Sequence, residues 1–100
     1  MRRAAFSVAA NMVEGFAHSP GKVRVNFLKV SQASLAEVGY CLHVALRLGY
    51  ITAALATELE VQVKEVGAPL AGLIRAARLK LATKVGIGIL LISALMTRLV

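Results

Sequence analysis

The chain has 100 residues, 58% of them hydrophobic, and its 12 Lys and Arg outnumber 5 acidic residues to give a net charge of +7. This length excludes a multidomain enzyme and allows one modest core. The abundance of Ala, Leu and Val, with only 5% aromatic residues, predicts an all-α fold. The positive charge predicts attraction to nucleic acid or acidic lipid, although charge of this kind also simply promotes solubility.

Residues 2 to 16 are predicted to form the first helix. At about 100° per residue, one broad arc of this helix is apolar and comprises Ala5, Phe6, Val8, Ala9, Met12, Val13 and Phe16. The other side carries a polar stripe of Arg3, Ser7, Asn11 and Glu14. Ser19-Pro20-Gly21 then supplies turn chemistry, which predicts a loop over residues 17 to 22.

A long second helix is expected from Val23 to Leu48. Its inner face alternates in steps of four and three residues through Phe27, Ser31, Ser34, Val38, Cys41, Ala45 and Leu48. The small residues of this seam would let a neighbouring helix approach closely, as in near-parallel or antiparallel bundle packing. Gly49 suits the end of the helix and Thr52 can cap the next one, so the short connection predicts antiparallel neighbours.

The third predicted helix extends to about residue 80, with a local bend at Pro69. Its acidic residues come early and its basic residues late, in agreement with the helix dipole. Beyond it, thirteen uncharged residues lie between Lys84 and Arg98, fewer than the about 20 that cross a bilayer as a helix. A membrane span is therefore not expected, and the tail is predicted to be a buried helix or an interfacial segment.

The sequence offers no set of residues for catalysis, metal binding or a cofactor. Its carboxylates are scattered, His18 belongs to the turn, and His43 lies on the outer side of the second helix. Cys41, the only cysteine, is expected in the core, and its being alone excludes an internal disulfide and favours a reducing cytoplasmic location. A non-enzyme is predicted.

Two groups of basic residues are candidates for nucleic-acid binding. On the outer side of the second helix, Lys29, Tyr40, His43 and Arg47 combine positive charge with a ring on which a base could stack. Arg75 and Arg78, three residues apart on the third helix, could contact phosphates. For the first group a solvated face is the favoured explanation, and the helix dipole alone also explains the second.

Two stretches match a known family in order and separation. RRAAFSVAANMVEGF, residues 2 to 16, and FLKVSQASLAEVGYCLHVALRLGYI, residues 27 to 51, resemble consecutive helices of the four-helix-bundle proteins related to 23S ribosomal-RNA intervening-sequence proteins. The matching positions include Arg2, Arg3, Ser7, Asn11, Glu14 and Gly15, followed by Leu28, Ser34, Leu35, Leu42, Leu48, Gly49 and Tyr50. Looser similarity continues to about Arg78.

The resemblance implies an up-down-up-down bundle that assembles into a homopentamer and has no enzymatic activity. Basic relatives work with RNA or DNA and with a reverse transcriptase, so nucleic acid and a partner of that type are implied. The family pattern also implies that Arg3, Ser7, Asn11 and Glu14 form a hydrogen-bonded stripe at a helix or subunit contact. The alternative is that these four side chains face water.

The chain departs from the family pattern at both ends. Family members carry another amphipathic helix before the Arg-Arg motif, whereas Met1 directly precedes the motif here, so a truncated relative is expected. The expected fold is an all-α, up-down antiparallel helical bundle in one domain, residues 1–100, with a family-like region over 2–80 and an apolar helical tail over 81–100. The expected function is self-association with binding of RNA or DNA. A membrane-surface protein held by its tail and a non-functional relative are the alternatives.

Overall fold

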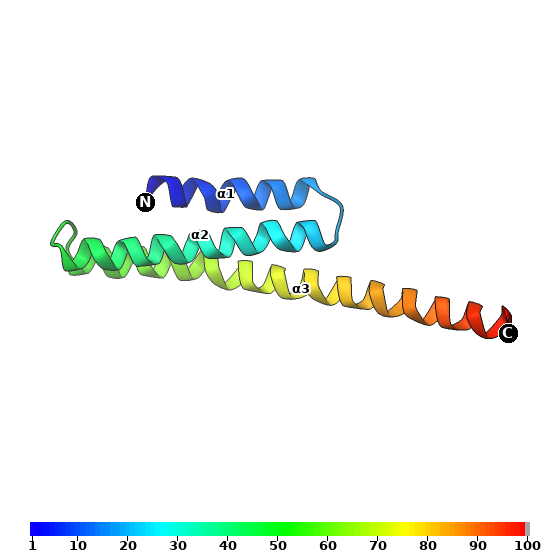
Figure 1. Ribbon diagram of the computed structural model, residues 1–100. Helices are drawn as coiled ribbons and strands as arrows, with labels where there is room; N and C mark the ends of the chain where they lie inside the picture. The colour runs from blue at the N-terminus through cyan, green and yellow to red at the C-terminus, as the bar shows by residue number, and fades with distance from the viewer. Residues whose placement is uncertain (100) are drawn as a thin grey trace.

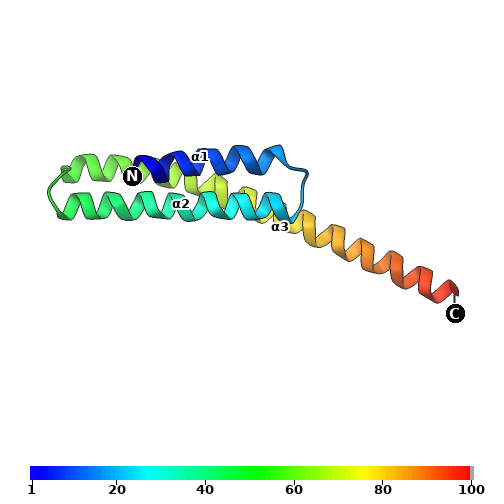
Figure 2. The same ribbon diagram turned by 45° about the horizontal axis from the view of Figure 1, so that its top comes forward.

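Three helices form the fold in the computed structural model, which describes residues 1–99. They are α1 (Arg2–Ala17), α2 (Lys22–Arg47) and α3 (Ala53–Leu99), and no strand occurs in this part of the chain. They run up, down and up, and α2 packs against both α1 and α3 (Figures 1 and 2). The predicted all-α class is confirmed, with antiparallel helices joined by short turns.

The turn between α2 and α3 closes as the sequence predicts. Gly49 adopts a positive φ of 78°, its amide donates to the Leu46 carbonyl at 3.1 Å, and the amide of Tyr50 donates to the Ala45 carbonyl at 2.9 Å. These two bonds satisfy carbonyls that the end of α2 leaves free. Thr52 caps α3, because its Oγ1 accepts a bond of 3.1 Å from the amide three residues later. The reversal is thus encoded locally.

The core lies where all three helices come together. Leu28 of α2 and Leu70 of α3 are each only 1% exposed, Ile74 lies beside them, and Met12 of α1 packs against this cluster. The contact between α2 and α3 is close, because a Cβ atom added to Gly67 would lie 3.3 Å from Leu35 Cδ2. A residue without a side chain on α3 therefore faces a large side chain of α2 at this point, which is typical of tightly packed helices.

The face that α1 turns toward α2 differs from the predicted apolar arc. Val8 is buried, but Phe6 is 72% exposed and Val13 and Phe16 are exposed too. The close approach of α1 to α2 decides which side of α1 faces α2, because the buried residues of α1 are mainly small ones. At Gly15, for example, an added Cβ would lie 3.3 Å from the Cβ of Phe27. The helix consequently packs through its small and polar residues and leaves its largest apolar side chains outside.

The inner face of α2 agrees with the prediction in the middle and differs at its end. Ser31 and Ser34 are buried and Cys41 is half-buried. Leu48, by contrast, is exposed, because α2 ends at Arg47 and Leu48 already belongs to the turn. The prediction that Leu48 lies on the inner face is therefore wrong, because the helical spacing was continued one residue past the end of α2.

The third helix continues without interruption through the predicted tail. Pro69 lies inside it and Gly86 and Gly88 do not end it, so α3 contains 47 residues. Its last part projects beyond α1 and α2, and the molecule measures 72 × 19 × 16 Å (Figure 1). Residues 82–98 are exposed, apart from Gly88, which is half-buried. The apolar tail therefore does not fold back onto the bundle.

Candidate nucleic-acid interface

Arg24 of α2 holds the C-terminal end of α1 in place. Its Nε donates to the carbonyl of Gly15 at 3.0 Å, and its Nη2 donates to the carbonyls of His18 at 2.7 Å and Phe16 at 3.3 Å. The guanidinium also lies over the ring of Phe16, 5.2 Å from its centroid. The last carbonyls of a helix carry partial negative charge, so one cation satisfies several of them. This role of Arg24 was not predicted from the sequence.

The polar residues Ser7 and Asn11 lie at the contact between α1 and α2. The hydroxyl oxygens of Ser7 and Ser34 are 2.8 Å apart, and Asn11 Nδ2 donates to the carbonyl and the hydroxyl of Ser7 at 2.8 and 3.0 Å. One turn along, Ser31 Oγ donates to the Val8 carbonyl at 2.7 Å in a fully buried site. Hydrogen bonds of this kind fix the pairing of two helices, because a shift would leave buried polar groups unsatisfied.

The other two members of the predicted stripe lie elsewhere. Arg3 and Glu14 are both exposed, on the edge of α1 beyond the contact with α2. The structure thus brings Ser7 and Asn11 together with two serines of α2, and it does not bring Arg3 or Glu14 to them. At about 100° per residue, Arg3 and Glu14 lie close together on one side of α1, turned away from the buried Ala4, Val8 and Gly15.

Replacing Asn11 tests whether the contact contributes to stability. We expect Asn11→Leu to lower the free energy of unfolding by about 1 kcal/mol, because it removes two hydrogen bonds and leaves the Ser7 carbonyl and the serine pair beside an apolar group. Thermal denaturation and native mass are the measurements. Glu14→Gln, an exposed control on the same helix, should change neither. Equal melting temperatures and equal masses for all three proteins would place Asn11 outside the interaction.

The predicted basic residues divide into two groups along the molecule. Tyr40, His43 and Arg47 are exposed near the far end of α2, while Lys29 is exposed near its start. At about 1.5 Å per residue, Lys29 and Arg47 lie about 27 Å apart along the helix. A single base or phosphate could not contact both groups, so they could act together only along an extended ligand.

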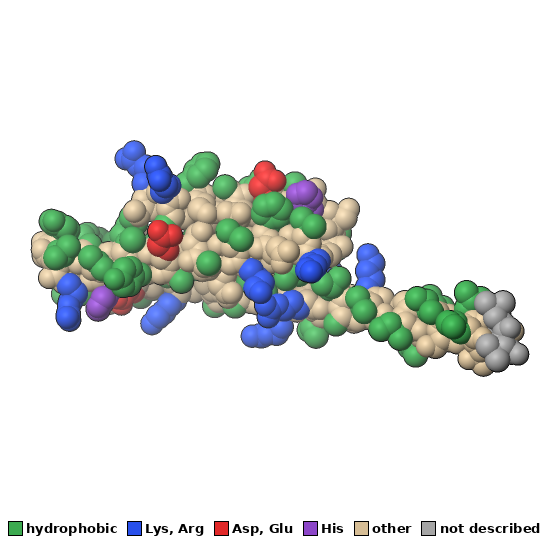
Figure 3. All heavy atoms as spheres, viewed as in Figure 1, with side chains coloured by type: hydrophobic (Ala, Val, Ile, Leu, Met, Phe, Trp, Pro, Cys, Tyr) green, Lys and Arg blue, Asp and Glu red, His purple; other side chains and the backbone are tan. Residues whose placement is uncertain are grey.

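Arg75 and Arg78 of α3 lie across the α2–α3 seam from the part of α2 that carries Lys29. They line a hollow of about 410 Å³ with Gln32 of α2, which is one helical turn from Lys29. Figure 3 shows Lys and Arg side chains gathered over the middle of this face, where the two helices run side by side. We call Lys29, Gln32, Arg75 and Arg78 the seam cluster. It places two guanidinium forks and an amide where a phosphate could be held.

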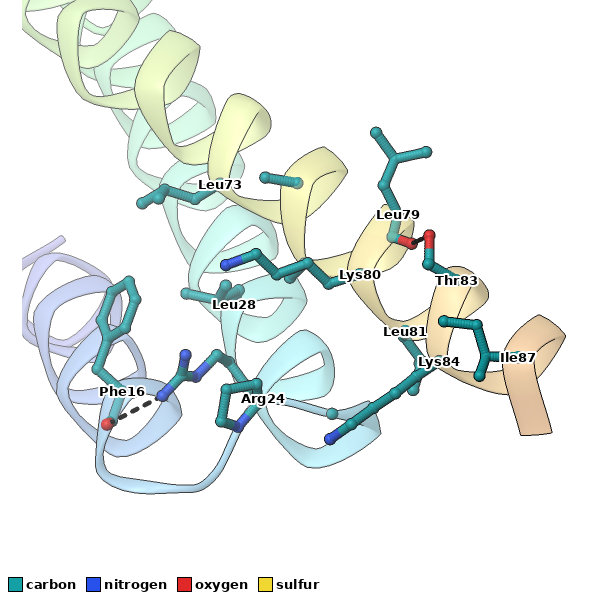
Figure 4. Close-up of a pocket in the computed structure, with 14 residues that line it drawn as sticks. Phe16, Arg24, Leu28, Leu73, Leu79, Lys80, Leu81, Thr83, Lys84 and Ile87 are labelled. Atoms are coloured by element: carbon teal, nitrogen blue, oxygen red, sulfur yellow. Dashed lines mark hydrogen bonds between the residues drawn. The ribbon is translucent and has the colours of Figure 1, made fainter. Parts of the chain in front are cut away.

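A second hollow, of about 540 Å³, lies at the base of the tail and was not predicted. It is bounded by Phe16 of α1, by Arg24 and Leu28 of α2, and by α3 (Figure 4). Lys80 and Lys84 extend from α3 along this hollow, Lys80 toward the helices and Lys84 toward the turn before α2. From the sequence, these two lysines were explained only by the helix dipole, which favours basic residues late in a helix. Their convergence with Arg24 depends on the turn between α1 and α2, which spacing within α3 cannot reveal.

Residues 1–99 contain no group of three or more His, Cys, Asp and Glu side chains that could hold a metal ion. The functional groups that converge are guanidinium, ammonium and amide donors, which suit anionic ligands rather than acid–base chemistry.

Comparison with known proteins agrees with the resemblance in sequence. The profile of the 23S rRNA-intervening sequence protein family matches residues 1–72, which cover α1, α2 and the first part of α3. No curated protein and no solved structure matches the chain. The matched region includes the Ser7–Ser34 contact, the Arg24 interaction and most of the core, and it ends before the basic part of α3. The chain belongs to the 23S rRNA-intervening sequence protein family.

Proposed function

We propose that this family member is a non-enzymatic helical protein of the cytoplasm that self-associates and binds RNA or DNA through the seam cluster. The observation that carries the proposal is the placement of Arg75 and Arg78 around one hollow beside Gln32, with Lys29 one turn away. Guanidinium groups match phosphate oxygens in pairs, and a net charge of +7 adds attraction that does not depend on sequence.

The exposed apolar side of α1 supports self-association. Phe6 and Val13 lie on the side of this helix opposite its buried residues, and both are exposed. Contiguous apolar side chains on a surface mark sites where another protein packs. A homopentamer, and a partner of the reverse-transcriptase type, are the assemblies that the family resemblance suggests for this surface.

The proposal predicts binding to RNA that weakens steeply with salt. We expect the Arg75→Gln/Arg78→Gln variant to lose at least about tenfold in affinity and to reduce the slope of log affinity against log salt by about 2, one unit for each lost phosphate contact. Fluorescence anisotropy with a structured RNA, measured at several salt concentrations, gives both quantities. Native mass with and without RNA reports the number of subunits that bind together.

A charge-matched control separates the seam cluster from general positive charge. Arg2→Gln/Arg3→Gln removes two exposed charges from the start of α1, so both double variants have a net charge of 7 − 2 = +5. The α1 variant should keep most of the affinity. Equal losses in the two variants would show that binding follows total charge, and binding that is absent or independent of salt would contradict the proposed function.

A further inference from the structure

Between Lys84 and Arg98 the projecting part of α3 is uncharged, and it carries large apolar side chains on opposite sides. At about 100° per residue, Ile87 and Leu91 lie on one side of the helix, whereas Ile89 and Met96 lie on the opposite side, and all four are exposed. A helix that packs against one neighbour needs only one apolar side. Large exposed apolar side chains on opposite sides of one helix need apolar surroundings on both of these sides, as in a bilayer.

The length and hydropathy of this segment agree with that requirement. Of the helices over residues 1–99, α3 is long and apolar enough to cross a membrane, judged by its length and composition. None of its most apolar stretch is buried against the rest of the protein. From Lys84 to Arg98 the helix rises about 21 Å, less than the hydrocarbon thickness of about 30 Å. Long Lys and Arg side chains compensate for such a difference, because they extend along apolar surroundings until their charges reach the polar layer.

Two threonine hydroxyl groups near the two ends of the tail bond within their own helix. Thr97 Oγ1 donates to the Ser93 carbonyl at 2.9 Å, and Thr83 Oγ1 donates to the Leu79 carbonyl at 2.9 Å. A hydroxyl that bonds within its own helix needs no water. Insertion would therefore leave these two groups satisfied.

Basic side chains surround the base of the tail. Arg75, Arg78, Lys80 and Lys84 form this basic ring, they are all exposed, and residues 66–100 contain no acidic residue. Their positions fall on different sides of α3, and two of them, Lys80 and Lys84, line the hollow shown in Figure 4. Arg24 in the same hollow already bonds to carbonyls of α1 and the following turn, which leaves the two lysines for an external anion.

We infer that residues 85–97 insert into a bilayer that contains anionic phospholipid, with Lys80 and Lys84 binding headgroup phosphates at the hollow beside Arg24. The charge complementarity between the basic ring and an anionic leaflet selects this occupant. An amphipathic helix lying in the surface plane would need a strongly charged or polar side, whereas residues 85–97 carry no charge and have Ser93 and Thr97 as their polar residues. This inference goes beyond the proposed function, because Lys80, Lys84 and residues 85–97 lie outside the seam cluster and the partner is a lipid surface, although the basic ring shares Arg75 and Arg78 with that cluster.

A tryptophan reporter tests insertion in the full-length chain. The protein has no Trp, and Leu90 is exposed in the middle of the tail, so Leu90→Trp supplies a single signal. With vesicles of phosphatidylcholine and phosphatidylglycerol in equal parts, we expect its emission to shift to shorter wavelength and to be quenched by lipids brominated deep in the acyl chain. Tyr40→Trp, on the exposed outer side of α2, is the matched control and should show neither change.

Substitutions on opposite sides of the tail distinguish a bilayer from a partner helix. Ile87→Gln/Leu91→Gln and Ile89→Gln/Met96→Gln should each weaken vesicle binding about tenfold or more in a sedimentation assay, since each removes two apolar side chains from lipid. Packing against a second copy would be weakened by only one of the two variants. The substituted side chains are exposed in the free protein, so each variant should keep the helicity and melting temperature of the original chain.

The role of the lysines has its own measurement. Lys80→Gln/Lys84→Gln should lower binding to the anionic vesicles about tenfold while leaving the weaker binding to pure phosphatidylcholine unchanged. Arg2→Gln/Arg3→Gln, with the same loss of charge, should bind almost as well as the original chain. Unchanged Leu90→Trp emission with vesicles, or a blue shift without lipid that grows with protein concentration, would overturn the inference, the second in favour of self-association through the tail.

Discussion

Leu28→Ala is expected to lower the free energy of unfolding by about 2 to 5 kcal/mol, the usual range for removing a buried leucine side chain. Leu28 is 1% exposed and packs with Leu70 and Ile74 of α3, while its Cδ2 lies beside Gly15 of α1. The cavity would thus open where the three helices meet. Because a domain of this size has a total stability of about 5 to 15 kcal/mol, denaturation in urea should show a clear shift of the midpoint.

An exposed leucine provides the comparison for this substitution. Leu90→Ala removes the same atoms from the tail, where the side chain is exposed, and should change the midpoint little. If Leu28→Ala and Leu90→Ala behaved alike in solution, the cluster around Leu28 would not form the core of the protein.

Arg24→Met is expected to cost about 2 kcal/mol of stability, because it keeps the apolar stem of the side chain and removes its hydrogen bonds to the carbonyls of Gly15, Phe16 and His18. The loss should be concentrated at the end of α1. Hydrogen exchange of the last-turn amides of α1 should therefore accelerate more than exchange in α3, and thermal denaturation gives the total.

Two further substitutions identify what Arg24 contributes. Arg24→Lys keeps the charge but lacks the planar fork, so it should recover less than half of the loss. Lys29→Met, an exposed position on the same helix, should be close to neutral. A loss in Lys29→Met as large as in Arg24→Met would indicate a general effect of charge on α2 instead of these specific bonds.

The ends of the helices could be predicted from sequence because their causes are local. Gly49 takes the positive φ that glycine accepts most easily, and Thr52 supplies a capping oxygen to an amide three residues later. The buried serines of α2 were also predictable, since small residues repeated at steps of four and three mark a closely packed seam. Such features depend on residues within one or two turns.

The orientation of α1 could not be predicted in the same way. Hydrophobic periodicity favoured the side with Phe6, Val13 and Phe16, but the energy of a contact depends on the shape of both surfaces. Gly15 and Ser7 fit closely against α2, and Asn11 completes the hydrogen bonds there. The family resemblance did direct attention to this polar side, because it places these residues in a shared pattern.

The candidate site was predictable as a set of charges and not as an arrangement. Arg75 and Arg78 were identified from their spacing, yet their meeting with Gln32 depends on how α2 and α3 align. Lys80 and Lys84 illustrate the same limit, because their shared hollow with Arg24 involves segments more than fifty residues apart. Contacts between distant segments arise from the packing of whole helices, which no local pattern contains.

The continuity of α3 past the bundle has a mechanical consequence. A flexible linker of this length would let its two ends reorient independently, whereas an unbroken helix acts as a lever that transmits both direction and rotation. A spin label near Met96 would then tumble at the slow rate of the whole molecule. A rotation imposed on the projecting end of α3 would likewise turn the part of α3 that packs against α2.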